Sequence, residues 1–302
     1  MNEVDVKVNS FKAWILASRP KTLSGAAVPV MIGTALAMRD ASFDIRIVPA
    51  VLCFLFAFLM QIDANFVNDY FDYVKGTDDE NRLGPKRACA QGWITEKAMR
   101  RGMALTTVLS CMVGLPLVVY GGWHMIVIGA ACVAFCFLYT TCLSYIGLGD
   151  VLVLLFFGFV PVCLTYYLDM PSGATLFSQE VVWTSLACGL VIDTLLVVNN
   201  YRDIDNDRRS GKKTLVVRIG ARASEKLYLG LGLTACISGF VLFYDRSMWA
   251  AFLPLGYLAL HIYTYREMIR IRKGSELNRV LGKTARNMFV YGLLQSVGLI
   301  IA

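Results

Sequence analysis

Charge is scarce in this sequence, and it is missing altogether over long runs. Only 17% of the 302 residues are Asp, Glu, Lys or Arg, whereas an ordinary soluble domain has about 25%. Residues 102–149 contain none of the four. A helix at the surface of a soluble protein needs a polar face, and these runs lack one, so the sequence excludes an ordinary soluble fold.

Histidine is nearly absent, and the cysteines are dispersed. The chain has 2 histidines, and none of its 9 cysteines forms a Cys-x-x-Cys pair. Structural zinc sites and disulfide frameworks depend on such groupings. Neither is expected here.

What the sequence does contain is a series of apolar segments long enough for membrane spans, which need roughly 17–25 residues. Two of these segments each include one carboxylate, Asp63 and Asp193. We predict nine spans, over residues 22–38, 46–67, 102–120, 124–142, 149–169, 181–201, 226–244, 247–265 and 285–302. The expected fold is an all-α polytopic membrane protein, a nine-helix bundle forming a single domain over 1–302.

The basic residues predict the orientation. With the N-terminus inside, 26 of the 29 Lys and Arg fall in four cytoplasmic segments, 1–21, 68–101, 202–226 and 266–286. This bias follows the positive-inside rule and predicts a multi-pass protein of the inner (plasma) membrane. It also accounts for the net charge of +7, so no nucleic-acid partner is expected. Within 1–21, the apolar and basic residues before Pro20 predict a short interfacial helix.

An Asn-led acidic signature occurs twice, each time where a predicted span ends. The first copy is Asn-Asp-Tyr-Phe-Asp at 68–72, and the second is Asn-Asn-Tyr-Arg-Asp at 199–203, continuing to Asp207. Oxygen ligands three or four residues apart lie on one helical face, and Mg²⁺ prefers oxygen ligands. A single such cluster is more often a cap or turn, but the recurrence on the same predicted side favours a shared site for Mg²⁺ and a lipid diphosphate.

Basic residues accompany both signatures in the predicted cytoplasmic loops 68–101 and 202–226. A diphosphate leaves an allylic carbon only when its developing charge is neutralised, and Mg²⁺ with Lys or Arg does this. The hydrophobic bundle would hold the isoprenoid tail and keep water from the allylic cation, which an aromatic ring would capture. Lys97, Arg100 and Arg101 are assigned to topology alone.

Three further carboxylates lie in or beside the apolar segments. Asp63 and Asp193 are functional candidates because an intramembrane carboxylate is costly unless paired; they would orient the metal ligands or accept a proton. The alternative is a position at the membrane edge that reaches water. Asp150 is most simply a helix-end charge favoured by the helix dipole.

The two signatures resemble the Asp-rich motifs of the UbiA superfamily of intramembrane aromatic prenyltransferases. Further segments resemble its 1,4-dihydroxy-2-naphthoate polyprenyltransferase branch, which serves menaquinone synthesis; they lie at 18–23, 65–72, 75–78, 82–87, 203–207 and 211–215. The resemblance runs from about residue 14 to 225.

This resemblance implies a central cavity among nine helices, Mg²⁺ dependence, and transfer of a polyprenyl group from its diphosphate to the aromatic acid, which loses its carboxyl group. With the reasoning above, it gives three groups of site residues. The metal ligands would be Asn68, Asp72, Asp78, Asn199, Asp203 and Asp207. The catalytic residues would be Asp63, Asp69, Asp72, Tyr139, Asp193 and Asp203. The substrate-binding residues would be Arg19, Lys21, Asn65, Lys75, Arg82, Arg87, Tyr201, Arg202 and Lys212.

Two alternatives stay open at this point. One keeps the enzyme class but changes the acceptor to 4-hydroxybenzoate, a chlorophyllide-type alcohol or a haem. The other is a secondary transporter for an anionic lipid or a metal. Transporters commonly have inverted repeats and helices broken at mid-membrane, and the same-side repeat predicted here argues against that class.

Overall fold

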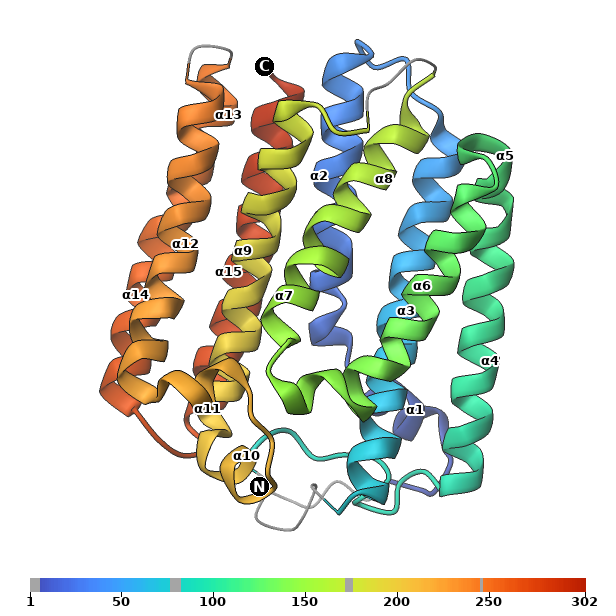
Figure 1. The fold of residues 1–302 in the computed structure, drawn as a ribbon, viewed down its shortest axis with the longest axis vertical. Coiled ribbons are helices and arrows are strands. Elements are labelled where there is room, and N and C mark those ends of the chain that lie inside the picture. The colour runs from blue at the N-terminus through green and yellow to red at the C-terminus, as the bar shows by residue number, and fades with distance from the viewer. Residues whose placement is uncertain (1–5, 77–82, 172–175, 245–246) are drawn as a thin grey trace.

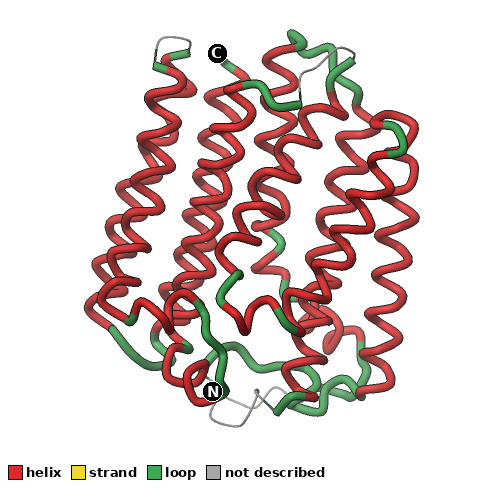
Figure 2. The backbone as a smooth tube through the Cα atoms, viewed as in Figure 1, coloured by secondary structure: helices red, strands yellow, loops and turns green. Residues whose placement is uncertain are grey.

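The described residues fold into a bundle of helices (Figures 1 and 2). The computed structural model describes residues 6–76, 83–171, 176–244 and 247–302, and within these ranges all regular structure is helical. The helices of the first half are α1 (Phe11–Ser18), α2 (Ser24–Asp40), α3 (Ile47–Val74), α4 (Glu96–Gly114), α5 (Val118–Gly121), α6 (His124–Thr141), α7 (Gly149–Val153) and α8 (Val160–Asp169). Those of the second half are α9 (Gln179–Arg202), α10 (Ile204–Arg209), α11 (Leu215–Ile219), α12 (Ala221–Phe243), α13 (Met248–Phe252), α14 (Gly256–Ile271) and α15 (Leu277–Ile300).

Three of the long rods are interrupted where proline removes a backbone donor. Pro116 lies in the 3-10 turn Leu115–Leu117 between α4 and α5, and Pro254 lies in the turn Leu253–Leu255 between α13 and α14. Pro161 is the second residue of α8, which directly follows the π-helical segment Leu154–Phe159 after α7. Each pair of helices therefore continues as one bent rod.

The predicted count of nine spans is not confirmed. In the described part of the chain, six helical segments are long and apolar enough to cross a membrane: Ile47–Val74, Glu96–Gly121, His124–Thr141, Gly149–Asp169, Gln179–Arg202 and Ala221–Phe243. The count becomes seven if α2 is joined to the segment before it, across a bend of 50°. Of the remaining rods, α14 has only 16 residues, and the first half of α15 carries Arg279, Lys283 and Arg286, which lower its hydropathy.

A helix, α1, forms where the interfacial helix was predicted, and its position at a membrane surface stays a prediction. Ser10 caps its first turn by accepting a hydrogen bond from the Ala13 N–H, and Phe11 is 82% exposed. Its other face packs on the bundle, where the rings of Trp14 and Phe66 meet edge to face at 5.3 Å. A helix with one buried and one exposed apolar face fits a position at a membrane surface.

Close packing around α9 requires glycine. A Cβ at Gly158, in the π-helical segment, would lie 2.7 Å from the carbonyl oxygen of Ser185 on α9. The helix α9 also packs against α12 and α15, so it lies in the middle of the bundle.

The helices α3 and α9 end at the same end of the bundle, which we call the motif end. Figure 1 shows α1, α10 and α11 at this end, while the C-terminal end of α15 lies at the other. Because each signature lies at the end of one of these two helices, the predicted same-side arrangement is confirmed.

Candidate active site

The two signatures line one cavity, which we call the motif cavity. Its volume is about 50 Å³. Its walls come from the end of α3, the segment after it, the turn after α6, and the region from the end of α9 to residue 212: Asp72, Arg87, Tyr145, Asn199, Asn200, Asp203, Asn206, Asp207, Ser210 and Lys212.

Helical spacing brings the second signature onto one face of the chain. The Asp203 N–H donates to the Asn199 carbonyl at 3.2 Å, and the Asp207 N–H donates to the Asp203 carbonyl at 2.8 Å. Hydrogen bonds between residues four apart keep the helical register across the junction of α9 and α10. The side chains at 199, 203 and 207 therefore point in one direction, into the motif cavity.

Arg202 organises this second signature. Its side chain is 0% exposed. Nε donates to Oδ1 of Asp203 at 2.8 Å, and Nη2 donates both to Oδ2 of Asp203 at 2.5 Å and to Oδ1 of Asn199 at 2.9 Å. The remaining Nη1 donates to Asn278 at 2.9 Å. This bidentate interaction fixes the orientation of the Asp203 carboxylate.

The first signature takes its arginine from a distant segment. Arg87 Nη2 donates to Oδ2 of Asp72 at 2.9 Å, and both residues are buried. Asp69 holds that segment in place, because its two oxygens accept the N–H groups of Ala88 and Cys89, each at 2.8 Å. The structure thus gives Asp69 a positioning contact, and it does not line the motif cavity.

The end of α6 contacts Asn68 and Lys75. The Thr140 hydroxyl donates to Oδ1 of Asn68. Lys75 Nζ donates to the carbonyls of Thr140 at 3.3 Å and Thr141 at 2.7 Å. These contacts fix both residues near the cavity although neither is among its lining residues.

Tyr145 is a cavity residue that the sequence reasoning missed. Its ring centroid lies 4.1 Å from Lys75 Nζ and 5.6 Å from Lys212 Nζ, within the range of cation–π attraction. The Lys213 N–H donates to its carbonyl at 2.9 Å. One aromatic ring thus lies near a lysine that follows each signature. The sequence cue for a turn here is Gly147. In the structure its φ is +81°, which confirms a turn.

Asp207 is the cavity carboxylate with a shifted pKa outside the spans. Burial raises the pKa of Asp207 to about 6. Lys212 opposes that shift, while Asp203 and Asp72 add to it. Carboxylates from both signatures therefore act on Asp207 across the cavity.

The Asp and Asn oxygens of the two signatures fit an Mg²⁺ ion that is also bound by phosphate and water. In the described ranges, no group of three or more His, Cys, Asp or Glu side chains could hold one metal ion. Mg²⁺, however, usually binds through one or two carboxylates together with substrate phosphates and water. The pair Asp203 and Asp207 with Asn199, and Asp72 with Asn68, match that pattern.

The two predicted intramembrane carboxylates are both buried, at 0% exposure for Asp63 and 2% for Asp193, so neither reaches water. Asp63 accepts hydrogen bonds from Thr106 at 2.5 Å and Thr107 at 2.7 Å. It thereby ties α3 to α4, away from the lining of the motif cavity.

Asp193 and Asp150 are two buried carboxylates that interact electrostatically. They lie within electrostatic range of each other, and Oδ1 of each has no hydrogen-bond partner among the described residues. Asp150 is 8% exposed, more buried than a simple helix-end charge requires. Tyr139 is within electrostatic range of both, and of Asp72 and Asp207 in the motif cavity.

Several predicted substrate-binding residues lie elsewhere. Asn65 donates to the Ser18 carbonyl at 2.9 Å and to Thr22 at 3.0 Å, which ties α3 to the turn after α1. Arg19 and Lys21 lie at this turn and are not among the lining residues. The Tyr201 hydroxyl donates to Glu225 at 2.7 Å. Asp78 and Arg82 lie outside the described residues.

The chain is similar to known proteins over nearly its whole length. The sequence profile described as the UbiA prenyltransferase family matches residues 26–293. The 1,4-dihydroxy-2-naphthoate octaprenyltransferase of Escherichia coli (strain K12) is 34% identical over 98% of this chain and 97% of its own. The enzyme of the same name from Mycobacterium tuberculosis (strain ATCC 25618 / H37Rv) is 34% identical over 94% and 95%.

Solved structures share the fold. A UbiA homologue from Archaeoglobus fulgidus bound to DMAPP and Mg²⁺ has a TM-score of 0.63 at 14% identity, over 94% of this chain and 99% of its own. The apo structure of a UbiA homologue from Aeropyrum pernix K1 has a TM-score of 0.66 at 13% identity, over 92% and 97%.

Proposed function

Because this chain belongs to the UbiA prenyltransferase family, we propose that it transfers a polyprenyl group from a polyprenyl diphosphate to 1,4-dihydroxy-2-naphthoate. The acceptor would lose its carboxyl group as CO₂, and diphosphate would be released. The relatives of that name support this acceptor. The observation that carries the proposal is the single cavity lined by both Asn-led signatures.

The diphosphate would bind in the motif cavity. Arg87 and Lys212 line it, and Lys75 lies beside it against the ring of Tyr145. Their positive charges would take up the negative charge that grows on the diphosphate as the allylic C–O bond breaks. Arg202 and Asp69 would hold Asp203 and Arg87 in position. Lys75 and Lys212 would be brought together by Tyr145.

Mg²⁺ would be held by Asp72 and Asn68 on one side and by Asn199, Asp203 and Asp207 on the other. When bound, Mg²⁺ supplies Lewis-acid neutralisation of the diphosphate oxygens. Asp78 remains a proposed ligand in the segment outside the described residues. The structure from Archaeoglobus fulgidus with DMAPP and Mg²⁺ supports metal dependence.

The carbon chemistry would take place on the bundle side of the cavity. The allylic C–O bond breaks, the ring carbon that carries the carboxylate forms the new C–C bond, and the C–CO₂⁻ bond then breaks to restore the aromatic ring. The electron pair of that bond returns to the ring, so no net proton is released at this carbon. Tyr139 would stabilise the allylic cation with its ring, and the apolar bundle would exclude water.

The protein is an integral multi-pass membrane protein, supported by its apolar helices and its family. We further propose that it lies in the inner membrane with its N-terminus and the motif end in the cytoplasm. The strong bias of Lys and Arg toward those segments supports this orientation. Both substrates would then enter from the cytoplasmic side or from the bilayer.

A direct assay tests the proposal. Purified protein in nanodiscs would be supplied with Mg²⁺, octaprenyl diphosphate and either 1,4-dihydroxy-2-naphthoate or 4-hydroxybenzoate, and products would be identified by mass spectrometry. We expect a prenylated, decarboxylated 1,4-dihydroxynaphthalene, detected as such or as the quinone that dissolved oxygen forms from it, and little product from 4-hydroxybenzoate. Faster turnover of 4-hydroxybenzoate would overturn the acceptor, and no product from any acceptor would overturn the enzyme class.

A further inference from the structure

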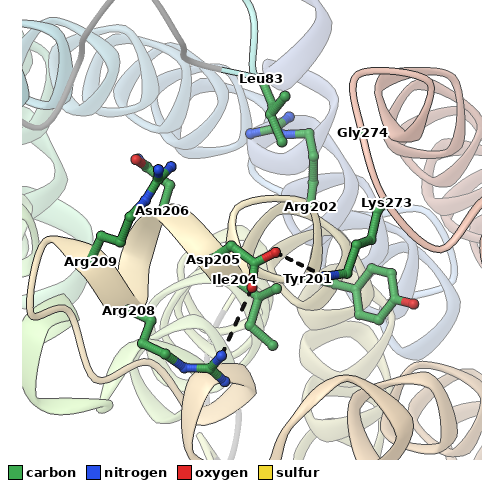
Figure 3. A pocket seen from close by; sticks show the side chains of 10 residues that line it. All are labelled: Leu83, Tyr201, Arg202, Ile204, Asp205, Asn206, Arg208, Arg209, Lys273 and Gly274. Carbon is green, nitrogen blue, oxygen red and sulfur yellow. Dashed lines mark hydrogen bonds and ion pairs between the residues drawn. The ribbon is translucent and has the colours of Figure 1, made fainter.

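A second and larger cavity opens at the motif end, on the other side of α10. Its volume is about 500 Å³, within the roughly 300–1,000 Å³ range typical of ligand sites. We call it the α10 cavity (Figure 3). It is lined by the end of α9, by α10, by the segment at Leu83 and by the loop between α14 and α15: Leu83, Tyr201, Arg202, Ile204, Asp205, Asn206, Arg208, Arg209, Lys273 and Gly274.

The wall between the two cavities is α10 itself. Asp203 and Asp207 line the motif cavity, whereas Asp205, Arg208 and Arg209 line the α10 cavity. Residues two and five positions from Asp203 point away from the 203–207 face of a helix, which explains the division. Asn206 lines both cavities.

The α10 cavity has more positive than negative charge. Figure 3 shows the single carboxylate of the lining, Asp205, between two cations. Lys273 Nζ lies 3.1 Å from its Oδ2, and Arg208 Nη1 lies 3.8 Å from its Oδ1. One carboxylate cannot neutralise Lys273, Arg208 and Arg209 together, and Arg202 is committed to Asp203 and Asn199. The surplus excludes a metal-cation site and favours an anion.

The cavity is also built on fixed backbone. The Asn278 side chain donates to the Leu83 carbonyl at 2.7 Å, which ties one rim to α15. The opposite rim turns at Gly274, whose φ is +99°, a conformation that a residue with a Cβ rarely adopts. Lys273 is therefore presented by a turn of defined shape, although its side chain is 76% exposed.

We propose that the α10 cavity is a second phosphate-binding site, separate from the metal–diphosphate site. Arg209 and Lys273 would donate charge-assisted hydrogen bonds to phosphate oxygens, and no metal ion would be needed. The phosphate could belong to free inorganic diphosphate or to the headgroup of an anionic lipid at the membrane surface. Binding here does not depend on prenyl transfer being the correct activity.

The test is binding of radiolabelled inorganic diphosphate to the full chain in neutral phosphatidylcholine nanodiscs, with EDTA present to remove divalent metal. Arg209→Gln/Lys273→Gln would be compared with the wild type and with Lys97→Gln/Arg100→Gln. The control pair makes the same change in net charge on exposed residues of α4 that do not line the cavity. Asp72→Asn, which alters only the motif cavity, would be measured in parallel.

We expect the wild type and Asp72→Asn to bind diphosphate in EDTA with similar affinity. Arg209→Gln/Lys273→Gln should weaken that binding by about tenfold or more, because two charge-assisted contacts are lost. The control pair should stay within about twofold, since distant exposed charges are screened by salt. No binding in EDTA, or equal binding by both double variants, would overturn the proposal.

A second arm identifies the source of the phosphate. The measurement would be repeated in nanodiscs containing phosphatidic acid. If a lipid headgroup fills the cavity, phosphatidic acid should compete with diphosphate in the wild type. If the cavity takes free diphosphate, binding in EDTA should be unchanged. Prenyl transfer by the same wild-type preparation is measured separately, so a failure of the proposed activity would be recognised independently.

Discussion

The two Asn-led signatures reach the same local arrangement by different routes. In both, the amide oxygen of an Asn accepts a hydrogen bond, and an Asp four residues later is paired with an arginine. The second signature contains its own arginine, Arg202. The first borrows Arg87 from a segment 15 residues away and Thr140 from α6. The second half is therefore self-contained, whereas the first depends on how its neighbours dock.

The largest expected effect comes from the shared carboxylates, and it should be equal in both halves. Asp72→Asn and Asp203→Asn should each lower kcat/KM for prenyl transfer by about a thousandfold, in line with the loss of one preorganised electrostatic group. Steady-state kinetics would measure this, with size-exclusion profiles as the check on folding. Near-normal turnover by either folded variant would remove that half from the site.

The next prediction concerns the second signature and the free energy of unfolding. Arg202→Gln leaves the Asp203 carboxylate, whose side chain is 14% exposed, without its arginine, and the loss of such charge-assisted hydrogen bonds costs about 1–3 kcal/mol of unfolding free energy. Thermal unfolding in detergent should show a large drop in Tm. The control is Arg208→Gln on the next helix, α10, where the ion pair with Asp205 is exposed and worth about 0–1 kcal/mol. Equal shifts in the two variants would contradict the role of Arg202.

In the first signature, a substitution that does not touch the cavity should still lower activity. Asp69→Ala removes both acceptors of the segment that carries Arg87, so kcat/KM should fall by about tenfold to a hundredfold, since bonds to a charged group contribute about 1.5–3 kcal/mol. Asp69→Asn keeps one acceptor oxygen and should lie between Asp69→Ala and the wild type.

A double variant decides whether Asp69 acts through Arg87. Asp69→Ala/Arg87→Gln should be no slower than Arg87→Gln alone, because the two changes remove one shared function. If the two effects multiply, Asp69 has a separate role and the borrowed arrangement is wrong.

The smallest effect concerns the residue that joins the halves. Tyr145→Leu removes the aromatic ring that lies near both Lys75 and Lys212, so KM for the prenyl diphosphate should rise about twofold to thirtyfold, the equivalent of about 0.5–2 kcal/mol of cation–π attraction. Tyr145→Phe keeps the ring and should behave as the wild type. A kcat loss shared by Phe and Leu variants would point to the hydroxyl instead.

Periodicity and recurrence were enough to predict an all-helical membrane bundle and both signatures at one end of it. Helical spacing alone placed Asn199, Asp203 and Asp207 on one face. The count of nine spans was not confirmed, since α14 has 16 residues and the first half of α15 carries three basic residues. Apolar runs in sequence do not reveal where a rod bends or how its length is divided.

The residues that pair with the site residues were harder to predict, because those pairs are set by tertiary contacts. No spacing rule links Asp72 to Arg87 or places Tyr145 between Lys75 and Lys212. Hydrogen-bond partners likewise distinguish two buried carboxylates that look alike in sequence. Asp63 accepts from Thr106 and Thr107, whereas Asp193 lies within electrostatic range of Asp150 and has one oxygen with no hydrogen-bond partner among the described residues.

The most direct test of the shared cavity is a double-mutant cycle on ligand binding. Affinity for a non-reacting prenyl thiodiphosphate with Mg²⁺ would be measured for the wild type, Asp72→Asn, Asp203→Asn and the double variant. If both signatures bind the same diphosphate, the affinity of the double variant for the analogue should be about as low as that of either single variant. Losses that multiply independently would mean that the two signatures do not share a ligand.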